Sequence, residues 1–525
     1  MPDQPPLEVE LKLAATAEAM DVLLASPLLR EHARSTVRAR NLHTTYYDTP
    51  DHRLSRRHLA FRVRRSGKSF VQTLKSANLA DGAGETRGEW EVALANGTPQ
   101  LGAFTDPAVV ELTGLVLPDE LTPIFETRFR RQAVLVEWPD ADRTPGQIEV
   151  AFDRGTIRAN GRESPICEVE LELKRGDAGT LFELADAMRA LVPLRLHPLD
   201  KAARGYLLAT GAPPAWHKAK PVELTPDLLV DEALQRILGG CLRHWLDNEA
   251  AARDGRQPEG LHQLRVALRR LRSALSLLEP ALGKKVREEW TGELRWLLGP
   301  LGPARDLDVF GTETMPRVRE ARADDDASLG ALAAVVADRR RGAQEAVREA
   351  LASERYGDLA FRFACWIARR GWRQGADVDV LLTQRQPVRD LADRILERRH
   401  RRVLKRGKRF KRLTPEQRHE LRIAFKKLRY GTEFFASLYP AKAVGRFRKA
   451  AARMQDVLGH LNDVAVAQHL VHGLLDGAPP GPPQMAAALG AGQVVGWYAC
   501  QSAELEPKAV AAWKEFRATE PFWTG

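Results

Sequence analysis

Two short segments, far apart in the chain, alternate charged and aliphatic residues in the same way. One is segment 8–12, near the start, and the other is segment 168–174. The charged positions are Glu8, Glu10, Lys12, Glu168, Glu170, Glu172 and Lys174. Because successive side chains of a β-strand point to opposite faces, both segments predict strands with one charged and one apolar face. A barrel with a polar lumen satisfies this pattern, since its apolar outer face can pack on helices.

Further strands are predicted between about 40 and 175, where the same alternation recurs between glycine-containing breaks that are typical of hairpin turns. One face of these strands carries basic residues. They are Arg62, Arg64, Lys75, Arg87, Arg128 and Arg130. Together with the glutamates of the two outer segments, they predict a lumen with both a cationic and an acidic lining.

This mixture indicates chemistry on phosphate. Arginine and lysine neutralise phosphate oxygens, and arginine often does so with two parallel hydrogen bonds. Carboxylates do not contact phosphate favourably unless a cation lies between them, and Mg²⁺ or Mn²⁺ fits that position. The pattern therefore predicts metal-dependent chemistry on a phosphate chain. A solvated sheet face with ion pairs would show the same alternation, and the pattern alone leaves this alternative open.

The composition is that of a multidomain globular protein. The chain has 525 residues, of which 44% are hydrophobic and 28% charged. We find no apolar run of membrane-spanning length and no signal peptide. The four cysteines are scattered, which fits a reducing cytoplasm.

The two parts of the chain differ in charge. Residues 1–210 have 27 Lys and Arg against 30 Asp and Glu, a net charge of −3, and the remainder carries +14. The proline-containing segment 211–226 separates them and reads as a linker. We therefore expect one domain over 1–210 and a basic, helical domain over 227–515, whose natural partner is a polyanion.

The helical part contains an internal repeat. Segments 262–272 and 419–429 match at an offset of 157, and Pro258-Glu259 recurs at Pro415-Glu416 with the same offset. This duplication predicts an all-α domain of two related bundles, at about 227–385 and 386–515. At helical spacing, each copy aligns basic residues in a ridge. The residues of the two ridges are His262, Arg265, Arg269 and Arg272, and His419, Arg422, Lys426 and Arg429. Solvated helix faces with local salt bridges would show the same pattern, which leaves this alternative open.

Residues 5–210 resemble the CYTH domains, the triphosphate tunnel metalloenzymes. The motifs are Glu8-x-Glu10-x-Lys12, Arg62-Val63-Arg64, Thr73-Leu74-Lys75, the segment 168–174, and Lys201-Ala202-Ala203-Arg204. The resemblance implies an α+β domain with an eight-stranded antiparallel β-barrel, the tunnel, that hydrolyses inorganic triphosphate with Mg²⁺ or Mn²⁺.

The resemblance also implies roles for these residues. The metal ligands would be Glu8, Glu10, Glu168, Glu170 and Glu172. The residues that bind triphosphate would be Lys12, Arg62, Arg64, Lys75, Arg87, Arg128, Arg130 and Lys201. A second metal, or a tunnel carboxylate such as Glu170, would orient and deprotonate the attacking water, with Lys12 as the second catalytic residue. Asp153 and Glu91 are weaker candidates, and a β-bulge would place Arg131 inside in place of Arg130.

Residues 222–515 resemble the CHAD domain, through the two His-x-x-Arg helices and the segments Leu301-Gly302…Asp306 and Leu458-Gly459…Asp463. This resemblance implies binding of inorganic polyphosphate along the two ridges.

The sequence thus predicts a cytoplasmic inorganic triphosphatase with a polyphosphate-binding module, with polyphosphate granules as a candidate location. The alternatives are hydrolysis of nucleoside or thiamine triphosphate or adenylate cyclase activity in the same tunnel, and a non-catalytic polyphosphate-binding protein. A membrane partner is not expected, and the absence of a nucleic-acid-binding motif argues against nucleic acid. Chain-length preference, the choice between Mg²⁺ and Mn²⁺, oligomeric state and an effect of the helical domain on turnover are not predicted.

Overall fold

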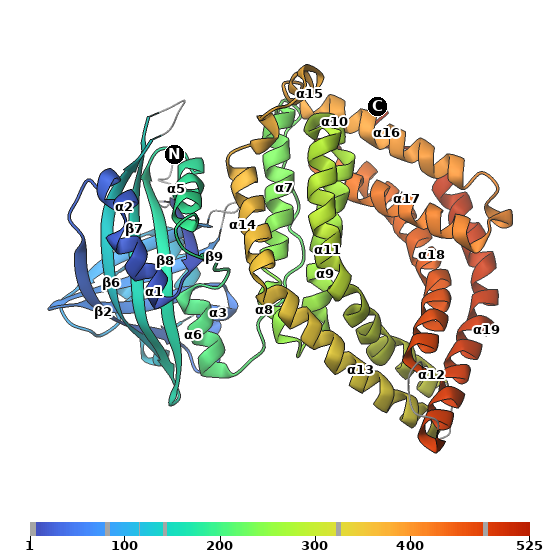
Figure 1. Ribbon diagram of the computed structural model, residues 1–525, viewed down its shortest axis with the longest axis horizontal. Helices are drawn as coiled ribbons and strands as arrows, with labels where there is room; N and C mark the ends of the chain where they lie inside the picture. The colour runs from blue at the N-terminus through green and yellow to red at the C-terminus, as the bar shows by residue number, and fades with distance from the viewer. Residues whose placement is uncertain are drawn as a thin grey trace. The chain divides into compact units, whose positions relative to one another are not determined.

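The computed structural model describes residues 7–78, 85–114, 116–139, 144–321, 327–475 and 481–524 (Figure 1). Within these ranges the side chains of a few residues, Glu8 and Arg87 among them, are not described. The chain divides into two compact units. The first comprises Met1–Ala215 and Glu354–Gly371, and the second comprises Trp216–Ser353 and Trp372–Gly525.

The first unit is built on an antiparallel sheet in the order β5-β4-β3-β2-β6-β7-β8-β1-β9. Its strands are β1 (Leu7–Ala14), β2 (Arg38–Asp48), β3 (Ala60–Ser66), β4 (Ser69–Asn78), β5 (Glu85–Leu94), β6 (Thr122–Trp138), β7 (Gly146–Ala159), β8 (Arg162–Arg175) and β9 (Arg195–Leu196). The strands that carry the two charged segments, β1 and β8, are neighbours, with Lys12 opposite Glu170. Eight long strands are present as expected, and β9 is a two-residue addition.

The sheet curls so that β5 also pairs with β1. This seam covers four residue pairs, from Leu7 opposite Gly88 to Glu10 opposite Glu85, whereas β6 and β7 pair from Glu126 opposite Arg158 to Trp138 opposite Gly146. The sheet is therefore joined along only a short part of β1, and the second half of β1 pairs with β8 and β9.

The outer face of the β2–β4 part of the sheet is apolar, as the alternation predicts. Phe61 and Leu74 are fully buried there against Leu101, Phe104 and Val109. The short helices that provide this cover are α3 (Arg53–Arg56), η1 (Leu101–Ala103) and α4 (Pro107–Thr113). Because these apolar side chains point away from the lumen, the residues that alternate with them on β3 and β4 point into it.

One end of the lumen is filled by apolar side chains. Leu42, Phe125, Phe129, Ile157 and Ile166, from β2, β6, β7 and β8, form a buried cluster. Helix α6 (Lys201–Thr210) packs on this cluster through Ala202, Tyr206 and Ala209. Its Gly205 lies against the ring of Phe125, where a Cβ atom would be 2.0 Å from the ring, so glycine permits the close packing.

Helix α14 (Glu354–Ala368) belongs to the first unit although it lies late in the sequence. It packs on α5 (Gly179–Arg189) and β9. The buried Phe361 contacts Phe182, with ring centroids 6.5 Å apart, and the guanidinium of Arg189 lies 4.3 Å from the Phe361 ring. Arg195 of β9 lies over the Tyr356 ring at 5.8 Å. This participation of α14 was not expected from the sequence.

The second unit is helical, and the repeat is visible in its elements. The first copy has α7 (Val230–Leu246), α9 (Pro258–Leu277), α11 (Lys284–Val309) and α13 (Ala327–Ala352). The second has α16 (Val388–Arg406), α17 (Pro415–Phe434), α18 (Ala441–Leu475) and α19 (Pro482–Ala518). Helices α9 and α17 have equal lengths and begin at the prolines expected at their first turns. The fold class predicted for this part, two duplicated helical bundles, is confirmed.

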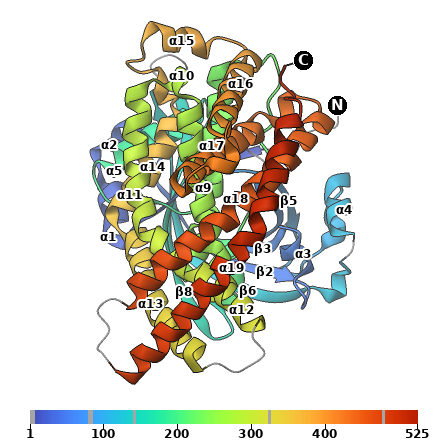
Figure 2. The same ribbon diagram turned by 90° about the vertical axis from the view of Figure 1, so that its right-hand side faces the viewer.

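The long helices α18 and α19 of the second copy run side by side (Figures 1 and 2), and α19 also packs on α13 of the first copy. Their ends share a core with α11 and α13, in which Leu332, Val336, Leu474 and Val494 are buried. The shorter helices are α1 (Ala17–Ala25), α2 (Pro27–His32), α8 (Glu249–Asp254), α10 (Glu279–Leu282), α12 (Met315–Glu320) and α15 (Val378–Gln384). Within the described part of the chain, no helix has an apolar stretch that would reach across a bilayer.

Candidate functional site

The sheet of the first unit encloses a cavity of about 550 Å³. Its charged lining residues are Glu10, Lys12, Arg62, Arg64, Lys75, Glu89, Glu91, Arg131, Glu149, Glu170, Glu172, Lys174, Asp200 and Lys201. A cavity of this size suits a small-molecule ligand. The density of both charge signs distinguishes it from the mostly apolar pockets that bind organic molecules.

Strand register places the carboxylates of this cavity in rows. Glu172 of β8 lies between Glu10 of β1 and Glu149 of β7, which are its direct partners on either side. Further along β8, Glu168 is the partner of Asp153 on β7. Since like charges on adjacent strands repel, this wall requires cations nearby.

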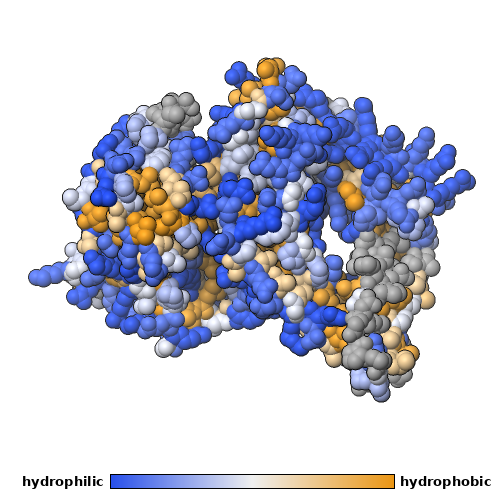
Figure 3. Space-filling view, viewed as in Figure 1, coloured by the Kyte–Doolittle hydropathy of each residue, from blue (hydrophilic) through white to orange (hydrophobic). Residues whose placement is uncertain are grey.

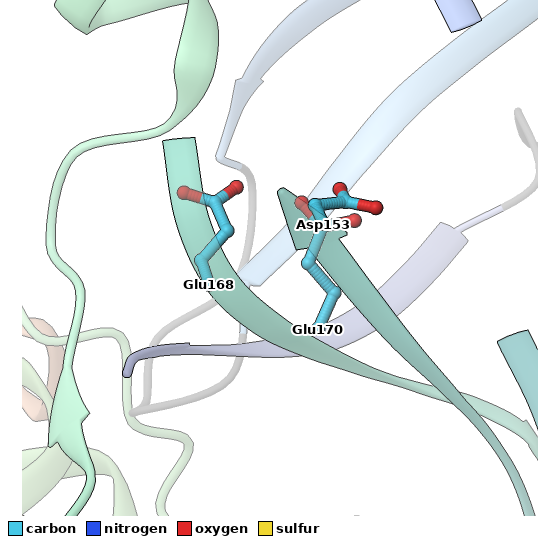
Figure 4. Close-up of side chains that lie close together, drawn as sticks. All are labelled: Asp153, Glu168 and Glu170. Atoms are coloured by element: carbon cyan, nitrogen blue, oxygen red, sulfur yellow. The ribbon is translucent and has the colours of Figure 1, made fainter. Parts of the chain in front are cut away.

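The tightest acidic group consists of Asp153, Glu168 and Glu170 (Figure 4). One carboxylate oxygen of each lies within 4.8 Å of the others. Asp153 and Glu168 are fully buried, while Glu170 reaches the cavity. Three carboxylates at this separation form a donor set of oxygen atoms only, which is what Mg²⁺ and Mn²⁺ prefer. The group therefore fits a divalent cation.

Lys201 of α6 compensates this charge in the structure. Its Nζ lies 2.7 Å from an oxygen of Asp153 and 2.9 Å from one of Glu170, and it also pairs with Glu168. Asp200 caps the helix by accepting a hydrogen bond from the backbone N–H of Ala203, so the start of α6 places Lys201 beside the acidic group.

Arg131 of β6 is the second compensating cation. Its Nε and Nη2 each lie 2.7 Å from one oxygen of Asp153, a bidentate pair, and Nη2 also pairs with Glu170. Arg204 adds a bond of 3.1 Å to Glu168. An ordered set of cations thus already surrounds the carboxylates, and a phosphate chain would compete for the same guanidinium and ammonium groups.

These contacts shift proton affinities in opposite directions along β8. Burial would raise the pKa of Glu170, but Lys201, Arg131 and Lys12 outweigh it and hold that pKa well below its usual range. Burial raises the pKa of Glu168, and the charge of Glu170 raises it further, in opposition to Lys201. Glu170 therefore remains ionised at neutral pH, whereas Glu168 binds a proton more readily.

A cationic wall lies on β3 and β4. Arg62 and Arg64 line the cavity with Lys75, and Glu89 of β5 pairs with Lys75 at 2.8 Å and with Arg62 at 3.2 Å. Burial lowers the pKa of Arg64 to about 10, and the nearby Arg62 and Arg131 add to this effect. Arg64 is therefore a strongly desolvated cation that an anionic ligand would stabilise.

The structure brings most of the predicted tunnel residues to this cavity. Glu10, Lys12, Arg62, Arg64, Lys75, Glu170, Glu172 and Lys201 line it, and Glu168 lies directly behind Lys201. Lys12 pairs with Glu10. The side chains of Glu8 and Arg87 lie outside the described residues, although their backbones pair in the seam between β1 and β5.

Arg128 and Arg130 do not line the cavity. They lie on the opposite face of β6, where they border a separate depression with Asn41 and His43. The register between β6 and β7 is unbroken from Glu126 to Trp138, so no bulge reverses the alternation. The reason is the apolar end of the lumen: Phe125 and Phe129 face inward, which places Arg131 inside and its neighbours outside.

Three residues of the site were missed or underrated, of which Arg131 and Glu149 line the cavity and Asp153 is buried. Arg131 was the alternative to Arg130, Asp153 was a weaker candidate, and Glu149 was not considered. The alternation in segment 148–154 could have identified Glu149, because Glu149, Ala151 and Asp153 share one face of a strand. Glu149 and Asp153 then belong to the same wall as the glutamates of β8.

In the second unit, the two predicted ridges come together because α9 packs on α17. Lys426 is at the centre: burial lowers its pKa to about 8, with further contributions from Arg422, Arg269, Arg429 and Arg265. Cations of both helices therefore surround one lysine. His419, at the start of α17, is exposed.

Arg265 is a ridge cation with unsatisfied hydrogen-bond donors in the part of the chain that the structure describes. Its buried Nε and Nη1 have no hydrogen-bond partner among the described residues. Burial and Arg269 lower its pKa to about 10, and Asp306 of α11 opposes this shift. Gly302 makes room, since a Cβ atom there would lie 3.3 Å from Nη1. Arg272 lies apart, closer to Arg295, and the side chain of Asp463 is outside the described residues.

Two known protein families match separate parts of this chain. Residues 6–206 match the CYTH domain model and residues 236–472 match the CHAD domain model. An inorganic triphosphatase of Haemophilus influenzae is 33% identical over 211 residues, which cover 39% of this chain and 55% of that protein. An uncharacterized protein of Mycobacterium tuberculosis is 26% identical over 294 residues, or 51% of this chain and 52% of that protein. The chain thus matches about half the length of these curated relatives.

Among solved structures, the CHAD domain from the plant Ricinus communis is 31% identical, with a TM-score of 0.51. The match covers 58% of this chain and 98% of that domain. The chain therefore belongs to the CHAD family through its C-terminal part, and its residues 6–206 match the CYTH domain model.

Proposed function

We propose that the cavity hydrolyses the terminal phosphoanhydride bond of inorganic triphosphate, or of the end of a longer polyphosphate, with Mg²⁺ or Mn²⁺. The observation that carries this proposal is the two-sided lining: a carboxylate wall on β1, β7 and β8 faces guanidinium and ammonium groups within one cavity of about 550 Å³. The first group requires a divalent ion and the second requires an oxyanion. The similarity to an inorganic triphosphatase supports the same reaction class.

In this proposal the cationic residues bind the phosphate chain. Arg62, Arg64 and Arg131 present planar forks to the phosphate oxygens, and Lys12, Lys75 and Lys201 act as point charges. The ionic contacts that these residues make with carboxylates are exchanged for contacts with the substrate. Because the groups are already held in place, they stabilise the charge that develops during phosphoryl transfer at little cost of reorganisation.

The carboxylates Asp153, Glu168 and Glu170 would hold the metal, with Glu10 and Glu172 next to them. The bound ion would neutralise phosphate oxygens and polarise water. The lowered pKa of Glu170 makes it a weak proton acceptor. We therefore assign Glu170 to ligating the metal and orienting the attacking water, which narrows the role expected from sequence.

We further propose that the paired ridges on α9 and α17 bind inorganic polyphosphate. The support is the convergence of Arg265, Arg269, Arg422, Lys426 and Arg429 around a partly buried centre. The carboxylate of Asp306 lies near Arg265 and offsets part of this positive charge. The ridge cations repel one another, and a flexible polyanion reduces this repulsion because several of its phosphates can contact several cations at once.

The substrate assignment is tested with the full-length chain. Phosphate release is compared at matched concentrations of inorganic triphosphate, ATP and thiamine triphosphate, each with Mg²⁺ or Mn²⁺. The proposal predicts the highest kcat/KM for inorganic triphosphate. A higher value for ATP or thiamine triphosphate would replace it with one of those activities, and cyclic AMP formation would indicate a cyclase.

A further inference from the structure

A second group of basic side chains lies on the other side of α17. It consists of Arg272 on α9, Arg287 on α11, Arg399 and Arg402 on α16, and Lys427 on α17, and we call it the second basic cluster. Ser276 of α9 joins its centre: Arg399 Nη2 donates to the Ser276 carbonyl at 2.8 Å, and Lys427 Nζ lies 3.5 Å from the Ser276 hydroxyl. Four helices therefore contribute cations to the cluster, and the contacts of Ser276 link three of them, α9, α16 and α17.

The second basic cluster has an opening to solvent. Arg399, Arg402 and Lys427 border a small depression between α16 and α17, with Ile423 and Ala424 as its apolar part and Arg406 at its edge. Its volume of about 20 Å³ admits little more than one water-sized group. The depression is small, so oxygen atoms of a phosphate can enter it while the rest of the phosphate group lies at its opening. Hydrophilic residues dominate the visible surface over α16 (Figure 3).

Negative charge is scarce in the cluster. Glu279 and Glu288 pair with Arg287, at 3.1 and 2.7 Å, and Glu420 pairs with Arg406 at 3.1 Å. Within the described ranges, Arg272, Arg399, Arg402 and Lys427 make no ion pair. Only 6% of the surface of Arg399 is exposed. Since buried cations cost free energy unless an anion accompanies them, the cluster is incomplete without one.

The electrostatic shifts agree with this shortage. Burial lowers the pKa of Lys427, and every further contribution comes from a cation, namely Arg399, Arg402, Arg272 and Arg287. Burial also lowers the pKa of Arg399 to about 10, which Glu279 opposes only in part. A bound anion would restore both groups toward their usual proton affinity.

The cluster is separate from the ridge residues around Lys426, and Arg272, which the sequence assigned to a ridge, belongs to this cluster in the structure. Lys427 follows Lys426 directly on α17, so their side chains point about 100° apart around the helix axis. Lys426 faces the ridge cations of α9, whereas Lys427 faces α16. A chain of phosphates could therefore contact both sides of α17 at once.

We propose that the second basic cluster is a phosphate-binding site, distinct from the ridges, that takes one phosphate group of a polyphosphate chain bound by the helical unit. This inference rests on the proposed polyphosphate binding and extends it to a second site. Arginine forks and a lysine around a small depression match a phosphate group and its several oxygens.

The test uses the full-length chain and polyphosphate of defined length, with binding followed by titration calorimetry. Arg402→Gln and Lys427→Gln remove charges of the cluster, and Arg402 is exposed, so its replacement leaves the fold intact. Arg401→Gln is the matched control, because Arg401 is the next residue, is exposed and pairs with Glu397. Lys426→Gln is the ridge variant. Inorganic phosphate is titrated separately.

We expect the double variant Arg402→Gln/Lys427→Gln to bind polyphosphate roughly tenfold more weakly, with a smaller salt dependence, and Arg401→Gln to bind as the wild type does. Equal losses in Arg401→Gln and Arg402→Gln, each of which removes one charge, would contradict the inference, since net charge alone would then explain them. Loss in Lys426→Gln but not in the double variant would overturn the second site and leave the ridge proposal standing. No loss in any variant would overturn both. Loss of inorganic phosphate binding without loss of polyphosphate binding would show that the cluster takes free phosphate, contrary to the inference.

Discussion

At the scale of single residues, the account depends on which face of a strand each charge occupies. Arg130 and Arg131 are adjacent on β6, yet Arg131 pairs with Asp153 and Glu170 inside the cavity, while Arg130 borders an outer depression. The inward-facing Phe129 explains why the sequence pattern placed Arg130 ahead of Arg131. The alternation rule assumes that apolar residues face outward, and this assumption fails where the lumen itself is filled.

This difference gives a prediction with an internal control. Arg131→Gln removes a bidentate cation from the cavity, so kcat/KM for triphosphate should fall roughly ten- to hundredfold, the range expected for a lost hydrogen bond between charged groups. Arg130→Gln should leave it unchanged. Steady-state phosphate release distinguishes the variants, and equal effects of both would contradict the placement of Arg131 at the substrate.

A second prediction concerns Lys426. Its pKa of about 8 means that it loses its proton as the pH rises through 8, and binding of a polyanion favours the charged form. Polyphosphate affinity should therefore weaken between pH 7 and 9, with proton uptake on binding. Lys426→Arg keeps the charge over this range, so its binding should be nearly independent of pH. Calorimetry in buffers of different ionisation enthalpy measures the uptake; a pH dependence that persists in Lys426→Arg would rule out this lysine as its source.

At the scale of elements, the strands and the duplicated helices followed from the sequence, because the alternation within a strand and the 157-residue offset between the repeats can be read directly from it. The starts of α9 and α17 at Pro258 and Pro415 are examples. The packing of α14 on α5 and β9 did not follow, because no local pattern indicates which distant surface a helix covers. The packing matters for the cavity, because β9 pairs with Leu13 and Ala14, which directly follow Lys12. The chain then runs from β9 to Lys201 at the start of α6.

We therefore expect the first unit to depend on α14. Phe361→Ala removes a fully buried ring that contacts Phe182 and Arg189, and should destabilise the unit by about 3–5 kcal/mol. Arg362→Ala, on an exposed position of the same helix, should cost less than about 1 kcal/mol. The temperature at which triphosphate hydrolysis is lost reports on this unit, and equal values for Phe361→Ala and the wild type would refute the dependence.

At the scale of the whole molecule, one chain combines a cavity with opposed charge walls and a helical unit with cationic surfaces. Much of the cavity could be predicted: the charges of β1, β3, β4 and β8 share one face by simple alternation. Asp153 ranked too low because its partners, Arg131 and Lys201, come from other elements: strand register brings Arg131 to it, and the packing of α6 brings Lys201. The cationic excess at Arg399 and Lys427 likewise needs the packing of three helices, which no single segment shows.

The most direct measurement of the central claim is phosphate release from inorganic triphosphate by the full-length chain, with Mg²⁺ or Mn²⁺ and after addition of a chelator, in the wild type and in Glu170→Gln. The account predicts release that requires the divalent ion and falls by about 10²-fold or more in Glu170→Gln, because the group that ligates the metal and orients the water is lost. The thermal stability of the variant should stay near that of the wild type, because Asp153 and Glu168 still accompany Lys201. Release that continues in the presence of chelator, or that survives intact in Glu170→Gln, would contradict the account.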